Sequence, residues 1–240
     1  MSATTDQAQW QAWMDEGYVY LAQWLNMLSD KQLDEPSGLA GWTRRHVLAH
    51  VGFNARALGR LVHWAASGEA TPMYADESAR AAEIAHGALL PVPELRELVR
   101  TEQFRLNVAL HLLEPAEWEV TVVTAQGRAV PAGTIPWLRA REVWVHAVDL
   151  QAGADFPDFP ADLLDALIID VVQTRRRREQ SPALVLAPLD RDEEWIIEAP
   201  GTPIRVLGRA ADLARWLTGR GVREVRSATG EPLPDLGPWL

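Results

Sequence analysis

The chain has 240 residues, of which 48% are hydrophobic and 23% are charged, and its formal net charge is −10. This is the composition of an ordinary folded protein, so it excludes the disordered, collagen-like and coiled-coil classes. The balance of 33 acidic against 23 basic residues argues against nucleic-acid binding, because phosphate contacts need a basic surface. An acidic substrate would need a local cationic pocket to offset the overall negative charge.

The chain contains no cysteine. Disulfides, thiolate zinc sites and a cysteine nucleophile are therefore excluded, and any thiol chemistry must use a thiol from outside the chain. The first ten residues are polar, and no stretch approaches the roughly 18 apolar residues of a membrane helix. We expect a cytoplasmic protein with no membrane partner, and the sequence does not predict its oligomeric state.

Four long segments have the periodicity of amphipathic helices, with apolar residues three and four positions apart. They cover residues 9–28, 43–68, 94–113 and 136–150, and a shorter helix is expected over 79–85. Thr43 is the predicted N-cap of the second long helix. Residues 118–123 alternate in side-chain character and are rich in β-branched residues. A turn at Gln126 and Gly127 separates them from residues 128–130, which predicts a short hairpin.

The second part of the chain has a mixed pattern. Helices are expected over 161–178 and 210–217, and strands over 184–186, 195–198 and 204–207. The sequence therefore predicts an α+β protein in which a four-helix bundle (1–153) is followed by a linker (154–160) and a small α+β domain (161–240).

Two histidines and a glutamate form a candidate metal site. Glu142 and His146 are four residues apart on an apolar helix, so both side chains lie on one face. His50 lies on the apolar stripe of the second helix and is expected to face the same interior. This His₂Glu set is typical of catalytic zinc sites, and it also suits non-haem Fe(II). The alternative is a partly exposed Glu142 with histidines that pack in the core, and His46 is a second-ranked neighbour or capping group.

Several short motifs resemble a known family. Residues 41–51 (GWTRRHVLAHV) are similar to the second-helix signature of the DinB-like, mycothiol-dependent enzymes. A more specific resemblance, to the mycothiol-dependent maleylpyruvate isomerase family, comes from four other segments: 63–65 (HWA), 71–74 (TPMY), 124–128 (TAQGR) and 141–150 (REVWVHAVDL). The resemblance extends to 218–221 (TGRG) and 227–231 (SATGE), and so covers nearly the whole chain.

The resemblance implies a fold, a reaction and a set of site residues. A divalent metal, usually zinc, would lie on His50, Glu142 and His146 in a DinB-like bundle. Mycothiol would be the thiol cofactor for the cis–trans isomerisation of maleylpyruvate to fumarylpyruvate in gentisate degradation. A sterol-carrier-like C-terminal domain would close over the metal site and contribute a functional arginine, which falls on Arg220.

The roles of several polar and basic residues are open to interpretation. Without the resemblance, Arg220 reads as a solvated turn residue. Arg128 is a second candidate for binding a carboxylate or an ordinary surface charge, and Asn54 is a candidate ligand-orienting or mycothiol-contacting residue. The arginine run 175–178 could form an anion-binding patch, but it is expected to face solvent near a helix C-terminus.

Other functions remain compatible with the same motifs. One is another metal- and thiol-dependent S-transferase or hydrolase of the DinB-like superfamily. A second is a non-enzymatic metal-binding regulator, which would carry an exposed apolar patch for its partner. A third is a structural bundle that binds no metal.

Overall fold

The computed structural model describes residues 3–178, 181–237 and 239. The chain divides into two compact units, Met1–Ala154 and Asp155–Leu240. The predicted domain limits at 153 and 161 stay a prediction.

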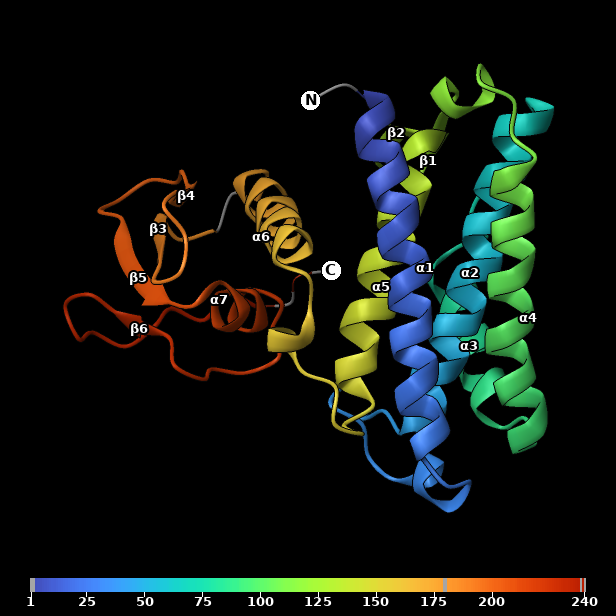
Figure 1. Cartoon of the computed structure of the whole chain (residues 1–240), viewed down its shortest axis with the longest axis horizontal. Coiled ribbons are helices and arrows are strands. Elements are labelled where there is room, and N and C mark those ends of the chain that lie inside the picture. The colour runs from blue at the N-terminus through green and yellow to red at the C-terminus, as the bar shows by residue number, and fades with distance from the viewer. Residues whose placement is uncertain (1–2, 179–180, 238, 240) are drawn as a thin grey trace. The chain divides into compact units, whose positions relative to one another are not determined.

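Four long helices form the first unit, as the periodicity predicted (Figure 1). They are α1 (Ala3–Met27), α2 (Arg44–Ser67), α4 (Val92–His111) and α5 (Ile135–Asp149), with α3 (Glu77–Ala88) between α2 and α4. Helix α1 packs on α5, while α2 contacts α3, α4 and α5. The α2–α5 contact matters most for function, because these two helices carry the three predicted metal ligands.

Helix α1 approaches α5 closely because a glycine faces a tryptophan. A Cβ atom built on Gly17 would lie 2.5 Å from Cδ1 of Trp144, which is closer than side chains pack. The indole Nε1 of Trp144 donates a hydrogen bond of 2.8 Å to the backbone oxygen of Trp13. The contact fixes the position of α5 at the level of residues 143–146.

A short hairpin precedes α5. Strands β1 (Thr121–Val123) and β2 (Ala129–Pro131) pair antiparallel, with the buried Val122 opposite Val130. The first strand is shorter than predicted, because residues 117–119 form the 3₁₀ turn η2 (Glu117–Glu119). The hairpin loop contains Thr124, Ala125 and Gln126, which line the cavity described below.

The second unit has two helices and a four-stranded sheet. Helix α6 (Ala161–Arg176) and helix α7 (Ala210–Leu217) accompany β3 (Leu184–Pro188), β4 (Trp195–Ile197), β5 (Ile204–Gly208) and β6 (Arg226–Ser227). The strand order is β4-β3-β5-β6, and only the β3–β5 pair among these strands is parallel. The α+β prediction is confirmed, while the sterol-carrier-like topology stays a prediction.

Two parts of the second unit differ from the sequence-based expectation. Residues 154–160 contain the 3₁₀ turn η4 (Phe156–Asp158), and both Phe156 and Phe159 are buried. Arg175, expected to face solvent, is buried and donates hydrogen bonds to the backbone oxygens of Leu217 and Leu236. This arginine therefore stabilises the packing of the C-terminal segment.

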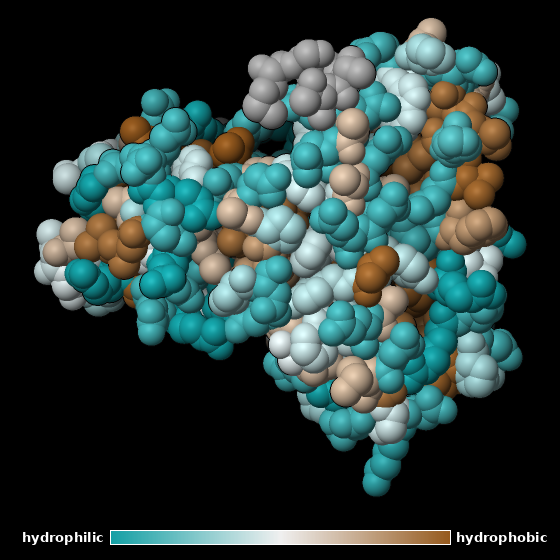
Figure 2. All heavy atoms as spheres, viewed as in Figure 1, coloured by the Kyte–Doolittle hydropathy of each residue, from teal (hydrophilic) through white to brown (hydrophobic). Residues whose placement is uncertain are grey.

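Much of the first unit is hydrophilic on the face shown in Figure 2, and a hydrophobic group lies over the upper part of α4. Phe104, Val108 and Leu112 are exposed there at four-residue intervals. Among the described residues, no helix has both the length and the apolar character needed to span a membrane.

Candidate functional site

The structure brings the three predicted metal ligands together inside the bundle. His50 comes from α2, and Glu142 and His146 come from successive turns of α5. Oε2 of Glu142 lies 2.9 Å from Nε2 of His50 and 3.3 Å from Nε2 of His146. The candidate ligand atoms of the three residues all lie within 4.8 Å of one another.

Burial and hydrogen bonding set the charge of each ligand. Burial lowers the pKa of His50 to about 4, against the opposing hydrogen bond to Glu142, so its imidazole is neutral at pH 7. Burial alone would raise the pKa of Glu142, but hydrogen bonds with His146 and His50 outweigh it and hold this pKa well below its usual range. A neutral imidazole and an ionised carboxylate are the forms that bind a divalent cation.

His146 is oriented by an acid on the same helix. Nδ1 of His146 lies 2.8 Å from Oδ2 of the buried Asp149. Burial alone would lower the pKa of His146, but hydrogen bonds with Asp149 and Glu142 outweigh it and raise this pKa. The contact leaves Nε2 as the nitrogen that faces Glu142, the usual arrangement for a metal-binding histidine.

Sequence reasoning missed Asp149, although a signal existed. An aspartate in the last turn of a helix is unfavourable for the helix dipole, so it needs a compensating interaction. His50 has no equivalent of Asp149, because its Nδ1 has no hydrogen-bond partner among the described residues.

His46 has a structural role at the start of α2. Its Nδ1 accepts a hydrogen bond of 3.3 Å from the backbone N–H of Thr43, and the Thr43 hydroxyl lies 2.8 Å from the same nitrogen. The predicted N-cap at Thr43 is therefore confirmed, and of the two readings for His46, capping is the one that its contacts support.

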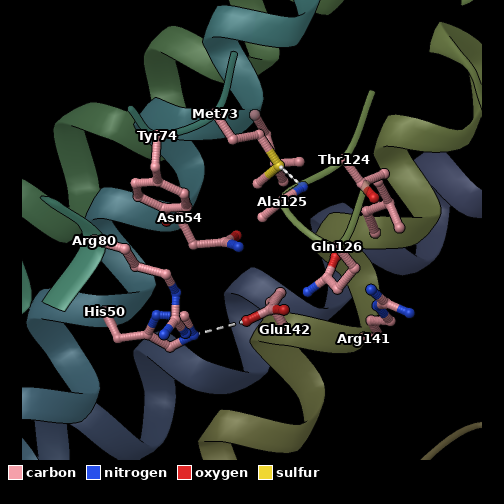
Figure 3. Close-up of a pocket in the computed structure, with 12 residues that line it drawn as sticks. His50, Asn54, Met73, Tyr74, Arg80, Thr124, Ala125, Gln126, Arg141 and Glu142 are labelled. Atoms are coloured by element: carbon pink, nitrogen blue, oxygen red, sulfur yellow. Dashed lines mark hydrogen bonds and ion pairs between the residues drawn. The ribbon is translucent and has the colours of Figure 1, made fainter. Parts of the chain in front are cut away.

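A cavity opens beside His50 and Glu142 (Figure 3). Its walls come from α2, α3, α5, the segment before α3 and the hairpin loop. The lining residues include Asn54, Tyr74, Arg80, Gln126, Arg141 and Glu142. Burial raises the pKa of Tyr74 to about 12, so its phenol is a neutral hydrogen-bond donor at physiological pH.

Asn54 is held by a buried arginine. Nη1 of Arg139 donates a hydrogen bond of 3.0 Å to Oδ1 of Asn54, and Arg139 has no exposed surface. The guanidinium also donates to Oε1 of Gln103 and to the backbone oxygen of Val51, each at 2.8 Å. Burial lowers the pKa of Arg139 to about 10, which still leaves it protonated.

Two more arginines were singled out by the sequence, Arg220 and Arg128. Arg220 lies in the second unit, in the turn after α7, where its Nη1 donates a hydrogen bond of 2.6 Å to the backbone oxygen of Thr218. Gly219 and Gly221 on either side have φ angles of 79° and 96°. Arg128 is half-buried in the hairpin loop and lies outside the set of described residues that line the cavity.

The fold and the site define a class of protein. A helical bundle that gathers two histidines and a glutamate beside a cavity, followed by a small α+β unit, is typical of a metal-dependent enzyme. A family model described as the mycothiol maleylpyruvate isomerase N-terminal domain matches residues 14–151.

Two solved structures are similar to the whole chain. One is the crystal structure of the mycothiol-dependent maleylpyruvate isomerase, with 37% identity, a TM-score of 0.94 and 100% coverage of both chains. The other is a variant of that enzyme with one histidine replaced by alanine, with 36% identity and the same TM-score and coverage. No curated protein matches the chain. The chain belongs to the mycothiol-dependent maleylpyruvate isomerase family, as its motifs predicted.

Proposed function

We propose that this chain catalyses the mycothiol-dependent cis–trans isomerisation of maleylpyruvate to fumarylpyruvate, as a cytoplasmic step of gentisate degradation. The observation that carries this proposal is the His50–Glu142–His146 cluster beside a cavity, in a chain similar over its full length to an enzyme of that name.

The donor set fits a divalent metal, for which we propose zinc. Two imidazole nitrogens and one carboxylate oxygen are a common set of protein ligands in catalytic zinc sites. His50 and Glu142 have the protonation states that metal binding needs, and Asp149 orients His146. When bound, the metal would lower the pKa of a coordinated mycothiol thiol, and the thiolate so formed would be the nucleophile for reversible addition to the conjugated double bond of the substrate.

The residues of the chain have two tasks in this reaction. Rotation requires the double bond to become a single bond for a time, during which its electron pair would be held as an enolate on the oxygen of the carbonyl group that is conjugated with it. The first task is to stabilise this negative charge with donors such as those that line the cavity. The second is to hold the carboxylates of the substrate in place. No side chain has to move a proton, because the electron pair returns when the thiolate leaves.

Arg220 is the proposed catalytic residue of the second unit, and the predicted domain 161–240 would contribute it to the active site. A guanidinium binds a carboxylate through two parallel hydrogen bonds, which a lysine does not. The support for this role is the resemblance of the TGRG turn, together with the positive φ angles of Gly219 and Gly221, which favour glycine and so leave Arg220 without a side chain on either neighbour.

The test is a product assay. Zinc-loaded protein is incubated with maleylpyruvate with and without mycothiol, and fumarylpyruvate is followed by NMR. We expect product only with mycothiol. Product without any thiol would contradict the thiolate mechanism. Absence of product under both conditions, with turnover of another electrophile in the presence of mycothiol, would favour the S-transferase function instead.

A further inference from the structure

A positively charged side chain from α3 faces the cavity beside the candidate metal centre. Figure 3 shows the Arg80 side chain extending from its helix towards His50 and Glu142. Arg80 and His50 both line this cavity. Among the residues that the structure describes, none forms a hydrogen bond or ion pair with the Arg80 guanidinium.

Two acids near Arg80 are paired with other side chains. Glu83, one turn further along α3, lies 3.2 Å from Nη2 of Arg60. Glu142, the carboxylate of the cavity, is held between His50 and His146 at 2.9 and 3.3 Å. A half-buried cation that faces a cavity without a protein partner favours the binding of an anion there.

A second donor of the cavity has a fixed direction. Because Oδ1 of Asn54 accepts a hydrogen bond from Arg139, the amide nitrogen Nδ2 is the atom left to face the cavity. Arg139 is fully buried, and the oxygens to which it donates belong to uncharged groups. Its positive charge therefore adds to the attraction of Asn54 for a negatively charged oxygen.

These two arrangements create a local positive potential in a chain of net charge −10. We propose that Arg80 and Asn54 form an anion subsite, in which Arg80 binds one carboxylate of a dicarboxylate substrate and the Asn54 amide donates a hydrogen bond to the carbonyl oxygen that becomes the enolate. The anion-subsite proposal rests on the proposed function, because that function supplies the identity of the substrate. It assigns the binding of one carboxylate to the first unit.

The carboxylate role of Arg80 is tested by binding, without turnover. Maleate, a stable dicarboxylate, is titrated into zinc-loaded wild-type protein and Arg80→Gln by calorimetry in the absence of mycothiol. We expect the Kd for maleate to rise at least about tenfold in Arg80→Gln, since one charge-assisted pair is worth about 1.5–3 kcal/mol. The zinc content should stay equal to that of the wild type.

Arg100→Gln is the matched control, because it removes the same charge from an exposed surface pair with Glu97. It should leave the Kd for maleate unchanged. If Arg80→Gln binds maleate as tightly as the wild type and the control do, the carboxylate role of Arg80 is wrong. Arg80→Lys should recover only part of the affinity, because it restores the charge without the planar fork.

The role of Asn54 is tested by Asn54→Asp, which keeps the acceptor for Arg139 and replaces the Nδ2 donor by an oxygen. We expect kcat to fall about 10²–10³-fold, as for loss of one donor to a developing oxyanion, with a smaller change in KM. An unchanged kcat would overturn the Asn54 assignment. The subsite proposal and the proposed function can fail separately. If maleate binding depends on Arg80 but the protein does not isomerise maleylpyruvate, only the proposed function is wrong. If the protein isomerises maleylpyruvate but maleate binding does not depend on Arg80, only the subsite proposal is wrong.

Discussion

The carboxylate of Asp149 lies 2.8 Å from Nδ1 of His146, while the same residue's backbone oxygen accepts a hydrogen bond of 2.8 Å from the backbone N–H of Gly38. Asp149 therefore joins the candidate metal centre to the loop between α1 and α2. The Asp149–His146 contact fixes the imidazole orientation before any metal binds. An imidazole held in this way binds metal more tightly, because less conformational freedom is lost on binding.

This contact predicts a defined loss in Asp149→Asn. The amide keeps the size of the side chain but removes the charge that orients His146, so zinc affinity should fall about 10–100-fold. Competition with a chromogenic chelator measures this affinity. An affinity equal to that of the wild type would show that Asp149 has only a structural role.

Removal of a ligand should abolish metal binding and activity together. We expect His50→Ala and His146→Ala to lose stoichiometric zinc, measured by elemental analysis after dialysis, and all turnover of maleylpyruvate.

His46→Ala is the matched control, because His46 lies one turn before His50 and caps α2. It should keep its zinc and lose about 0.5–2 kcal/mol of stability. Full zinc occupancy in His50→Ala would contradict the assignment of the site.

Arg220 should contribute to turnover but not to metal binding. Arg220→Ala is expected to keep stoichiometric zinc while kcat/KM falls by at least about tenfold, the lower end for loss of a charge-assisted carboxylate contact. Steady-state kinetics and zinc analysis on the same preparation measure both quantities. Normal kinetics in this variant would remove Arg220 from the mechanism.

The close approach of α1 and α5 depends on Gly17. A Cβ atom there would lie 2.5 Å from Trp144, so Gly17→Ala should destabilise the protein by about 1–3 kcal/mol in urea denaturation. Gly59→Ala is the matched control, since Gly59 also lies inside a helix and its Cβ would meet nothing within 4 Å. It should be neutral or stabilising, because alanine is the better helix former. Equal effects of the two substitutions would contradict the packing argument.

The second unit should lose stability in acid through Asp155. Its carboxylate accepts a hydrogen bond of 2.6 Å from Arg223 and also pairs with Arg215. Burial alone would raise the pKa of Asp155, but bonds from Arg223, the Phe156 N–H and Arg215 outweigh it and lower this pKa below 3.8. The stabilisation is therefore complete above pH 3.8 and is lost as the pH falls through the folded-state pKa.

Asp155→Asn should consequently be less stable than the wild type at pH 7, and the difference should shrink below about pH 3.8. Urea denaturation at several pH values measures this. Arg215, which pairs with Asp155, also donates a hydrogen bond of 3.2 Å from Nη1 to the backbone oxygen of Arg220, so it links Asp155 to the turn that carries Arg220. A difference in stability that does not depend on pH would contradict the ionic role of Asp155.

The sequence predicted the elements whose signals are local. The apolar spacing of α2 and α5 predicted both helices, and the four-residue spacing of Glu142 and His146 placed them on one face. His50 joined them because its apolar stripe had to face the interior. The fold class and the family followed from these same segments.

The residues that sequence reasoning missed depend on contacts between distant segments. The sequence around Arg80 does not indicate that it could bind an anion. That inference depends on Glu83 pairing with Arg60, 23 residues earlier, so that Glu83 does not neutralise Arg80. Arg139 reads as a charge on an apolar helix, and only the packing of α5 against α2 and α4 reveals its acceptors. Arg175 was misread for a similar reason, since the carbonyls that it binds lie 42 and 61 residues away.

X-ray absorption at the zinc edge tests the central claim most directly. Zinc-loaded protein is measured before and after addition of mycothiol. The account predicts nitrogen and oxygen ligands alone at first, in agreement with two imidazoles and a carboxylate, and then one new sulfur ligand at about 2.3 Å. A spectrum unchanged by mycothiol, in a preparation that isomerises maleylpyruvate, would contradict activation of the thiol at the His50–Glu142–His146 site.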